Sequence, residues 1–580
     1  MRLIRVDVAE GTLTEEPLPA GRRHYGGRML TSAVVAEEVP PLCHPLGPSN
    51  KLIIANGLLA GHANAPCSGR LSVGCKSPLT GGIKEANCGG DAGCYLGRLG
   101  IRGVILEGLP AAGDWRLLRI GSDGTQLLPA APYIGLNTYD LVSALRRDFG
   151  EKASVIGIGT AGEQRLIASG IAVTTIEGPP SRYAARGGVG AVMGAKRLKA
   201  IVVEAIGGSG IPLADPERFR SLCAEFAREV RESRKVLREY GTANLVNPIN
   251  ELGGLATRNF SVGTFEGAEA ISGETMRERI DARGGVQGMA CMPGCPIQCA
   301  NRYVCADGTV VDDIEFESLT LLGANCGIDD LDTVAKLERL CDDLGLDTID
   351  IGGAIGVAME AGLLPFGDGP GALRLLEEVG KGSPLGKIIG SGAAVAARVL
   401  GVRRVPAVKG QGISAYDPRG LKGMGVTYVS SPMGADHTAG AAIPNRPGIG
   451  ELNLDTMDRR DKDRLSLDLQ LMTGVLDALG VCMFTGPVVS TIEWWARILT
   501  AATGEEWTFR RLLEFAEAMI RRERDFNRRA GFTPHDDRLP EHFLSEPLPP
   551  KGPVFDVADA AIDRMCGSLS VADRLEGTAH

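Results

Sequence analysis

The stretch DALGVC at residues 477–482 ends a helical pattern, and a matching stretch, DDLGLD, ends another at residues 342–347. Each has the form Asp-x-x-Gly-aliphatic followed by an acid or a cysteine. Glycine directly after a helical pattern is typical of a helix C-terminus, because it adopts the left-handed conformation without strain. Two equivalent turns that each present an acid indicate two equivalent groups to hold. In the second turn, Cys482 replaces the last acid.

A cysteine loop precedes both turns. The stretch ACMPGCPIQCANRY at 290–303 carries Cys291, Cys295 and Cys299, with a glycine and a proline between them. A structural zinc site needs a second pair of ligands, and no matching pair follows. A [4Fe–4S] cluster can take three thiolates from one loop and a fourth from far along the chain, and Cys482 is the candidate for the fourth. The other alternative is three buried, unligated thiols.

The composition is that of a soluble globular protein. The 580 residues are 44% hydrophobic and 23% charged, and the net charge of −9 gives no global basic surface for nucleic acid. No apolar run reaches the length of a transmembrane helix, and the N-terminus lacks the hydrophobic region of a signal peptide. We therefore expect no membrane insertion and a cytoplasmic location. Fourteen cysteines then indicate metal ligation or buried thiols rather than disulfides.

The pattern of apolar residues changes about a third of the way along the chain. Up to about residue 205, short apolar runs such as KLIIANG (51–57) alternate with Gly, Pro and Asp turns, which is typical of strands. After Pro212 helical spacing dominates, as in 214–240 and 509–529. The order of the two patterns predicts an α+β fold.

We predict three domains. No internal repeat is visible, and the tail after Pro549 is expected to be loosely structured at most. The predicted units are a β-rich N-terminal domain over 1–207 and two mostly helical domains over 208–405 and 406–580.

Four further motifs follow one another along nearly the whole chain: RLSVGCKSPLTG (70–81), ARGGVGAVMGAK (185–196), AYDPRG (415–420) and GFTPHDDRLP (531–540). Together with the cysteine loop and the two turns, they resemble the tungsten-containing aldehyde ferredoxin oxidoreductase family. Members of that family bind one tungsten through the dithiolenes of two pterins, beside a [4Fe–4S] cluster. The resemblance implies a β-rich base domain and two helical domains, with the cofactor at their junction.

The resemblance also implies which residues hold the cofactor. The turn acids Asp342, Asp347 and Asp477 match acids that accept hydrogen bonds from pterin N–H groups. Arg70 matches an arginine between the cluster and a pterin, where a guanidinium can bond both sulfur and phosphate. A Mg²⁺ ion bridging the pterin phosphates belongs to the same expectation. The other residues matched to cofactor contacts are Asn87, Gly89, Ala185, Arg186, Gly187, Gly188, Val481 and Cys482.

Three residues match positions near the metal. Glu317 would act as a general base or orient a water, and His437 would hydrogen-bond the substrate oxygen. Tyr416 would line the same pocket. Without the resemblance, Glu317 is more readily explained as a solvated acid on a helix. His437 alone is as readily a surface residue as a functional one.

The chain departs from the family pattern in ways that bear on its substrate. The first gap of the cysteine loop is one residue longer than usual, and Phe316 stands where a tyrosine usually precedes the glutamate. CMPGC and ANCGIDD resemble a bacterial branch that includes the tungsten subunit of class II benzoyl-coenzyme A reductase. In that branch a cysteine is thought to ligate the metal, and Cys326 is the candidate here. The alternative is that Cys326 is a small buried residue.

Several other cysteines are not assigned as ligands. Because the family's usual pattern has no second cluster near the predicted cofactor residues, we expect the cysteines there to be buried thiols. They are Cys67, Cys75, Cys88 and Cys94.

Three functions remain open. The first is a tungsten pterin oxidoreductase that oxidises an aldehyde and passes electrons through the [4Fe–4S] cluster to ferredoxin or to a ferredoxin-like iron–sulfur subunit. The second keeps the cofactors but reduces an aromatic acyl-CoA or another unsaturated substrate, as a subunit of a complex. The third is an iron–sulfur electron-transfer or scaffold subunit without chemistry at the metal. In each, we expect an oligomer or a complex subunit that binds no nucleic acid.

Overall fold

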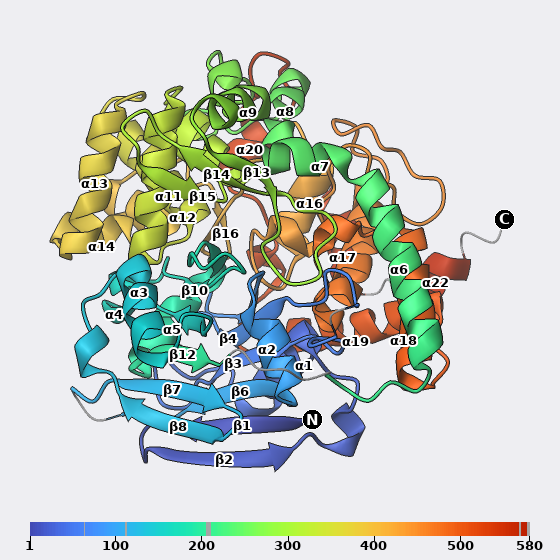
Figure 1. Ribbon diagram of the computed structural model, residues 1–580. Coiled ribbons are helices and arrows are strands. Elements are labelled where there is room, and N and C mark those ends of the chain that lie inside the picture. The colour runs from blue at the N-terminus through green and yellow to red at the C-terminus, as the bar shows by residue number, and fades with distance from the viewer. Residues whose placement is uncertain (63, 111–112, 205–209, 568–569, 577–580) are drawn as a thin grey trace.

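The computed structural model describes residues 1–580 apart from 63, 111–112, 205–209, 568–569 and 577–580. The strands of the N-terminal region form the lower part of the molecule as drawn in Figure 1, and most helices stand above and beside them. The predicted boundary between residues 207 and 208 lies outside the described residues. Across the described ranges, no helix combines the length and the apolar character needed to cross a bilayer.

Two six-stranded sheets make up the N-terminal region within the described residues. The first has the order β2-β1-β6-β3-β4-β5 and the second the order β8-β7-β12-β9-β10-β11. Their strands are β1 (Arg2–Asp7), β2 (Thr12–Pro17), β3 (Leu52–Asn56), β4 (Leu71–Lys76), β5 (Ile83–Cys88), β6 (Ile101–Glu107), β7 (Arg116–Gly121), β8 (Gly124–Pro129), β9 (Ser154–Gly157), β10 (Ile171–Val173), β11 (Arg182–Ala184) and β12 (Leu198–Val203).

The second sheet repeats the first strand for strand. β1 pairs antiparallel with β2 and parallel with β6, and β7 pairs in the same way with β8 and β12. The helices repeat as well. One helix follows the hairpins β1–β2 and β7–β8, and one precedes the strands β6 and β12. They are α1 (Gly27–Glu38) and α3 (Thr138–Phe149), then α2 (Ala92–Arg98) and α5 (Val189–Ala195), with α4 (Thr160–Glu163) additional in the second half. No repeat is visible in the sequence, and the structure corrects that expectation by showing an internal duplication of the fold.

Apolar strands explain why these sheets are covered on both faces. Every residue of β3, β4 and β12 is buried. Continuous apolar runs are typical of strands with packing on both sides, whereas alternation is typical of half-exposed ones. Ile54, Val73, Ile156 and Ile201, from both sheets, belong to one core. The two halves therefore form a single base.

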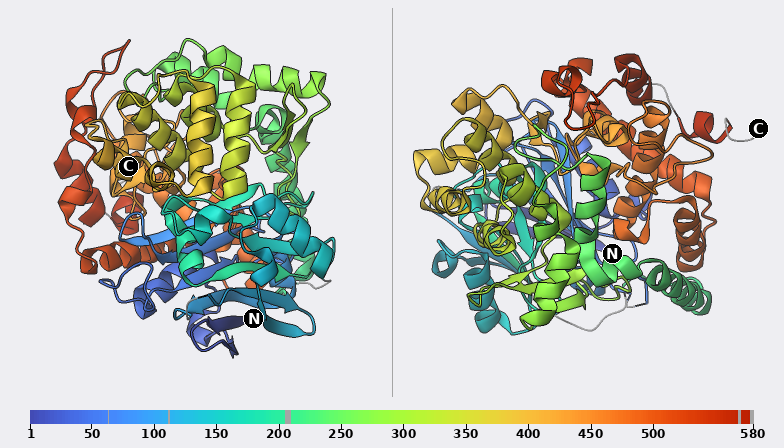
Figure 2. Two further views of the ribbon diagram at one scale, coloured as in Figure 1. Left: turned by 90° about the vertical axis from the view of Figure 1, so that its left-hand side faces the viewer. Right: turned by 90° about the horizontal axis from the view of Figure 1, so that it is seen from above.

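The rest of the chain is mostly helical, as predicted. Two groups of helices stand on opposite sides of the base: the yellow α11–α14 on one side and the orange α16–α19 on the other (Figures 1 and 2). The first part contains α6 (Pro216–Ser233), α7 (Lys235–Tyr240), α8 (Val246–Leu252), α9 (Gly273–Ala282), α10 (Phe316–Ser318), α11 (Leu331–Leu344), α12 (Thr348–Glu360), α13 (Gly369–Lys381), α14 (Pro384–Ile389) and α15 (Ala393–Leu400).

The C-terminal part contains helices that close the second side of the molecule. They are α16 (Lys422–Ser430), α17 (Lys462–Leu479), α18 (Val489–Thr503), α19 (Phe509–Arg529), α20 (Glu541–Ser545), α21 (Asp559–Gly567) and α22 (Val571–Glu576). The last two correct the expectation of a loosely structured tail. Ile562 and Met565 of α21 are buried, so this segment packs on the helical core.

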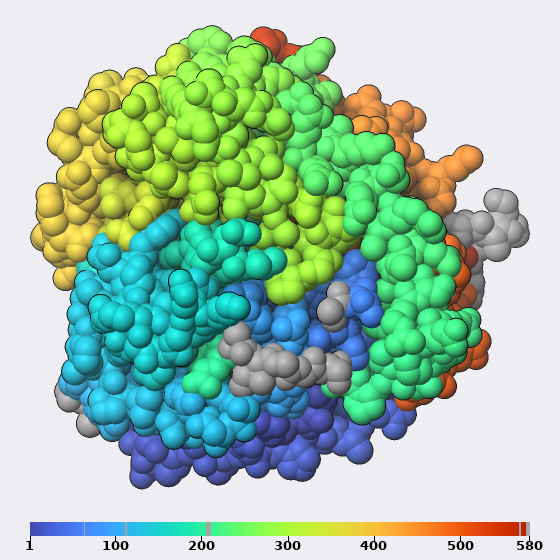
Figure 3. Space-filling view, viewed as in Figure 1, coloured from blue at the N-terminus to red at the C-terminus, as the bar shows by residue number. Residues whose placement is uncertain are grey.

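A small three-stranded sheet carries the cysteine loop. It consists of β13 (Val286–Met289), β14 (Ala300–Val304) and β15 (Val310–Asp312), and the loop connects β13 to β14. A further hairpin, β16 (Ala407–Val408) with β17 (Gln411–Gly412), lies where the sequence placed the boundary between the helical domains. In the space-filling view, the green segments lie directly against the blue and teal base (Figure 3).

The two matched turns are equivalent helix ends. α11 ends at Gly345 with φ +80°, and α17 ends at Gly480 with φ +67°. In both turns the residue after the glycine donates its backbone N–H back into the helix, to Cys341 O in the first and to Leu476 O in the second. This is the pattern that glycine favours at a helix C-terminus. The turn geometry inferred from the sequence is confirmed.

Each turn docks on the base through the same backbone contacts. Gly170 N donates to Gly345 O at 3.0 Å, and Arg70 N donates to Gly480 O at 3.1 Å. Two residues after each glycine, Asp347 N donates to Ala168 O at 2.9 Å and Cys482 N donates to Cys67 O at 3.0 Å. Each half of the duplicated base therefore receives one helix end.

Glycines in the base make room for these helix ends. A Cβ at Gly57 would lie 2.0 Å from Leu479 O, and a Cβ at Gly159 would lie 2.3 Å from Leu344 O. Neither glycine has a positive φ, so the requirement is for space rather than for backbone conformation.

We expect Gly57→Ala and Gly159→Ala to push the helix ends off the base. Each should lower the stability by about 1–3 kcal/mol, the usual cost of overpacking a close contact. The measurement is the apparent melting temperature beside that of Gly21→Ala, where a Cβ meets nothing within 4 Å. Equal melting temperatures for all three variants would contradict the role given to these contacts.

Candidate active site

A cavity of about 760 Å³ lies where the base meets both groups of helices. The base contributes Arg70, which directly precedes β4, and residues of β5, of β11 and of the segment after β11. The helical parts contribute both turns and the loops around α10 and α16. Many residues predicted from the sequence line it. They are Arg70, Asn87, Ala185, Arg186, Glu317, Asp342, Asp347, Tyr416, His437 and Cys482.

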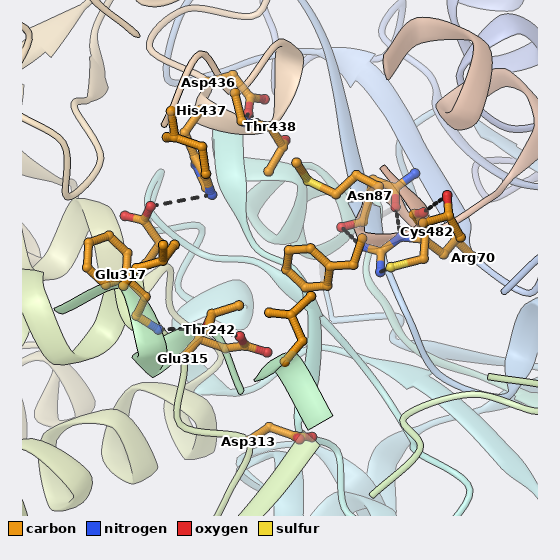
Figure 4. Close-up of a pocket in the computed structure, with 18 of the residues that line it drawn as sticks. Arg70, Asn87, Thr242, Asp313, Glu315, Glu317, Asp436, His437, Thr438 and Cys482 are labelled. Carbon is orange, nitrogen blue, oxygen red and sulfur yellow. Dashed lines mark hydrogen bonds and ion pairs between the residues drawn. The ribbon is translucent and has the colours of Figure 1, made fainter. Parts of the chain in front are cut away.

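Glu317 and His437 face one another at one end of the cavity (Figure 4). The Oε1 atom of Glu317 lies 3.6 Å from His437 Nε2, and Oε2 accepts a hydrogen bond from Ala415 N at 2.8 Å. Among the described residues, Glu317 Oε1 and His437 Nδ1 have no hydrogen-bond partner, which is unusual for buried polar atoms. Burial raises the pKa of Glu317 above its ordinary value. Both residues line the cavity, where a bound molecule can contact them.

Tyr416 packs beside this pair. Its ring lies 5.0 Å from that of Phe316, between centroids. Burial, with Glu317 nearby, raises the pKa of Tyr416 well above its ordinary value. The phenol therefore stays protonated and can donate a hydrogen bond into the cavity.

Buried basic groups line the base side of the cavity. Arg186 lies with Nε 3.3 Å from Asp347 Oδ2 and donates to Ala435 O at 2.5 Å. Lys84 Nζ donates to Asp436 Oδ2 at 2.8 Å. Burial disfavours the charged carboxylate of Asp436, but Lys84 and Arg186 outweigh it and hold the pKa well below its ordinary range. A charged wall of this kind suits an anionic group such as a phosphate.

The other end of the cavity is formed by Arg70, Asn87 and Cys482 (Figure 4). Arg70 Nε donates to Asn87 Oδ1, and Nη1 lies 3.9 Å from Cys482 Sγ. The guanidinium therefore contacts the thiol of the second turn while remaining on the cavity wall. This is the arrangement expected of an arginine between two prosthetic groups.

The cysteine loop meets the second turn through Cys67. Its N–H donates to Gly294 O at 3.3 Å, and its carbonyl accepts from Cys482 N at 3.0 Å. Cys291 lies within electrostatic range of Cys295 and Cys482, although burial is the main reason that its pKa rises to about 12. The four thiols assigned to a cluster from the sequence are therefore brought together.

Two residues at this site were not identified from the sequence. Cys67 lies with Sγ 4.0 Å from Cys295 Sγ, and its thiol lowers the pKa of Cys295 to about 6. Arg182 lies beside Cys291 and pairs with Asp313 and Glu315 at 2.8 Å. Cys67 is buried as expected, but no sequence signal distinguished it from the other buried thiols. Arg182 stands in a short strand without a recognisable motif.

Some predicted cofactor residues support the cavity wall from behind. Gly187 and Gly188 have φ of +80° and +74°, and a Cβ at Gly187 would lie 2.5 Å from Lys84 Cγ. A Cβ at Gly89 would lie 3.1 Å from Cys291 Sγ. Asp477 bonds to Arg28 at 3.2 Å, away from the cavity lining, and burial raises its pKa to about 7. Val481 is likewise buried outside the lining.

Cys326 does not reach the cavity. After α10 the chain continues as a π-helix over Leu319–Gly323 and a 3₁₀ turn over Ala324–Cys326. These changes of helical pitch turn the thiol toward Leu321 O, at 3.3 Å, and Gly352 O, at 3.7 Å. The position therefore does not support Cys326 as a tungsten ligand. It fits the alternative of a small buried residue.

The residues present fit the predicted cofactors. The cavity combines carboxylates for pterin N–H groups with Arg70, Lys84 and Arg186 for phosphates. Burial raises the pKa of Asp342 well above its ordinary value, so N–H donors would stabilise its charged form. Within the described part of the chain, no three ligand-type side chains come close enough to hold a single ion. A cluster of several metal atoms spaces its thiolates more widely.

Comparison with family models matches nearly the whole chain. The model described as "Aldehyde ferredoxin oxidoreductase, N-terminal domain" matches residues 3–205. The model described as "Aldehyde ferredoxin oxidoreductase, domains 2 & 3" matches residues 221–567.

Individual relatives agree with the family models. The tungsten-containing aldehyde ferredoxin oxidoreductase of Pyrococcus furiosus is 34% identical over 577 residues, covering 95% of this chain and 92% of that one. The one of Thermococcus kodakarensis is 34% identical over 575 residues, with the same coverage. A more distant relative is the WOR-like subunit of aliphatic sulfonate oxidoreductase of P. furiosus, at 28% identity over 509 residues, 78% of this chain and 76% of that one.

A solved structure shares the fold. The active-site complex BamBC of benzoyl coenzyme A reductase with 1,5-dienoyl-CoA superposes with a TM-score of 0.79. The match covers 93% of this chain and 90% of that one at 21% identity, so it supports the architecture alone.

Cys482→Ala is expected to lose the cluster, because a [4Fe–4S] cluster held by three protein thiolates is less stable than one held by four. The measurement is iron per chain, together with the broad visible absorption of anaerobically purified protein. Cys67→Ala is the matched control: it removes a neighbouring thiol and should keep the iron. If Cys67→Ala loses iron and Cys482→Ala retains it, Cys67 rather than Cys482 is the fourth ligand.

Proposed function

Because the chain belongs to the aldehyde ferredoxin oxidoreductase family, we propose that it oxidises an aldehyde to a carboxylic acid at a tungsten centre held by two pterins in the central cavity. The family is one of oxidoreductases, and its curated relatives contain tungsten. The observation that carries the proposal is the facing pair of Glu317 and His437, two titratable side chains that both line the cavity.

The reaction requires an oxygen atom and a place for two electrons. An aldehyde and a water give a carboxylic acid, two protons and two electrons. The tungsten pterin group, when bound, supplies the two-electron acceptor. The protein must therefore orient the aldehyde and move the protons.

Glu317 and His437 divide this work. Glu317 accepts a proton from the water at Oε1, the oxygen that has no hydrogen bond in the structure. Its other oxygen is fixed by Ala415 N, so the carboxylate is oriented. His437 donates a hydrogen bond to the carbonyl oxygen of the substrate, and Tyr416 donates a second from its protonated phenol.

The electrons leave on the side of the cysteine loop. A [4Fe–4S] cluster held by Cys291, Cys295, Cys299 and Cys482 supplies the one-electron relay. Arg70 contacts Cys482 and lines the cavity, so it would lie between the two groups when both are bound. Cys295 is the partly exposed member of the four thiols. We propose that ferredoxin or a ferredoxin-like subunit docks on this loop.

The remaining elements of the proposal concern metal, assembly and location. Asn87 and Ala185, on opposite halves of the base, would stand at the pterin phosphates and at a bridging Mg²⁺. We expect the chain to assemble as an oligomer or with an iron–sulfur subunit. None of the fourteen cysteines, all of which the structure describes, forms a disulfide, and we propose a cytoplasmic location on that ground.

Two alternatives are less well supported. Reduction of an aromatic acyl-CoA was linked to Cys326 as a metal ligand, and that thiol points to backbone carbonyls outside the cavity. A scaffold role without chemistry at the metal leaves the Glu317–His437 pair unexplained.

Anaerobically purified protein should contain about one tungsten, two pterins and four iron atoms per chain. It should also reduce methyl viologen with an aldehyde from a panel of aliphatic and aromatic compounds. Metal analysis and viologen absorbance are the measurements. Iron without tungsten or pterin would overturn the proposal, as would a loaded protein that oxidises none of the aldehydes.

Glu317→Gln should lower kcat/KM by about 10²–10⁴-fold while leaving the tungsten content unchanged. Burial raises the pKa of Glu317 above its ordinary value of 4.5, and a general base must be deprotonated to act. The kcat/KM of the wild type should therefore decrease as the pH is lowered, and the midpoint of this decrease should lie above pH 4.5. The exposed Glu239→Gln is the control and should keep both the rate and the decrease at low pH. If the decrease of kcat/KM at low pH persists in Glu317→Gln, another group is responsible for it.

A further inference from the structure

The cavity extends outward from Glu317 and His437 into a mostly apolar channel. Its walls include Phe226 from α6, Leu237 from α7, and Ile443 and Phe484 from the C-terminal part. Val236, which is 58% exposed, lies at its rim, so the channel opens to solvent. The inference that follows rests on the proposed function, because it concerns the substrate that this channel admits.

Two arginines line the apolar channel side by side. Arg234 Nη2 and Arg446 Nη1 lie 2.5 and 3.5 Å from the position that a Cβ would take at Gly486. Gly486 has a φ of +103°, and a side chain there would enter the space of both guanidinium groups. The absence of a side chain therefore lets the two cations approach each other.

The two arginines differ in how they are held. Arg234 donates to Phe484 O at 2.8 Å and to Thr485 O at 2.9 Å, so it is fixed by backbone carbonyls. Arg446 makes no hydrogen bond or ion pair within the described residues, although it is only partly exposed. Arg446 is thus a cation on the channel wall whose donors are unused.

The charges around the pair do not neutralise it. Glu229 is the carboxylate that lines this part of the channel, where it acts on Arg234 and accepts from Trp494 Nε1 at 2.8 Å. For Arg446, the interacting groups are Arg234 and Tyr416. Burial lowers the pKa of Arg446, and the neighbouring Arg234 lowers it further. A partly buried guanidinium with a like charge beside it is less favourable than a paired one, and a bound anion would stabilise both cations.

We propose that Arg446, with Arg234, binds an anionic group at the far end of the substrate, so that the enzyme acts on aldehydes that carry a second, negatively charged group. A guanidinium fork matches the paired oxygens of a carboxylate, a sulfonate or a phosphate. Tyr416 lies within electrostatic range of both Arg446 and Glu317. One molecule can therefore present its aldehyde to Glu317 and its anion to Arg446, with an apolar segment between them.

The experiment compares matched aldehydes on the holoenzyme: 4-carboxybenzaldehyde with 4-methylbenzaldehyde, and glyceraldehyde 3-phosphate with glyceraldehyde. The expected kcat/KM of the wild type is about tenfold or more higher for the charged member of at least one pair, as for a charge-assisted hydrogen bond. The pair that shows the effect distinguishes carboxylate from phosphate. In Arg446→Gln the ratio should fall about tenfold, and in Arg446→Lys it should fall less, because the charge remains.

A binding measurement separates this inference from the proposed function. Equilibrium dialysis of terephthalate against 4-methylbenzoate should show tighter binding of terephthalate, lost in Arg446→Gln and retained in the control Arg238→Gln. Arg238 is an exposed residue of α7 outside the cavity lining. Arg446-dependent binding without oxidation of any aldehyde would uphold the anion site and refute the proposed function. Equal kcat/KM within both pairs would overturn the anion site, as would a charge preference that persists in Arg446→Gln.

Discussion

The architecture depends on two helix ends that dock on a duplicated base. Gly345 and Gly480 end α11 and α17, and the next residues hydrogen-bond to equivalent segments of the two sheets. Because the contacts are between backbones, they fix the carboxylate and the thiol that follow within narrow limits. Gly57 and Gly159 permit the approach. Asp347 and Cys482, which line the central cavity, are positioned by these two contacts.

Burial of many charges is the second constraint. The cavity wall contains guanidinium, ammonium and carboxylate groups, and several are paired, as in Lys84 with Asp436. Removing such groups from water is costly unless they are hydrogen-bonded, and Glu317 retains an unpartnered oxygen. Natural proteins keep such arrangements mainly at functional sites. The inner cavity and the outer channel differ in how their buried charges are paired. The inner cavity has many charged groups and suits a large polar cofactor, whereas the outer channel has an unpaired arginine, Arg446.

Much of the fold could be predicted because it depends on local patterns. The helix over 509–529 follows from apolar spacing, and the matched turns identify Cys482 as the partner of a distant loop. The duplication could not be predicted, because many different apolar sequences satisfy the same strand pairing. Cys67 was missed as a neighbour of Cys295 because only long-range packing brings the two thiols together.

Other differences have local causes. The resemblance made Cys326 a candidate metal ligand, and the π-helical turn between Glu317 and Cys326 directs its thiol to backbone carbonyls. The helical pattern over 214–240 forms two helices, α6 and α7, which meet at Arg234. The spacing of apolar residues does not indicate this break. Arg234, the residue at the break, lines the channel with its guanidinium group.

The duplicated base has a consequence for the direction of electron flow. Two halves with the same strand order would hold the two proposed pterins in similar surroundings. Such an arrangement does not by itself favour one route by which electrons leave. The two docked turns differ at an equivalent position, because Asp347 in the first turn corresponds to Cys482 in the second. If the thiol joins a cluster, this difference gives only the second turn a path for electrons. Polarity in this enzyme would then originate from one side chain placed on a twofold scaffold.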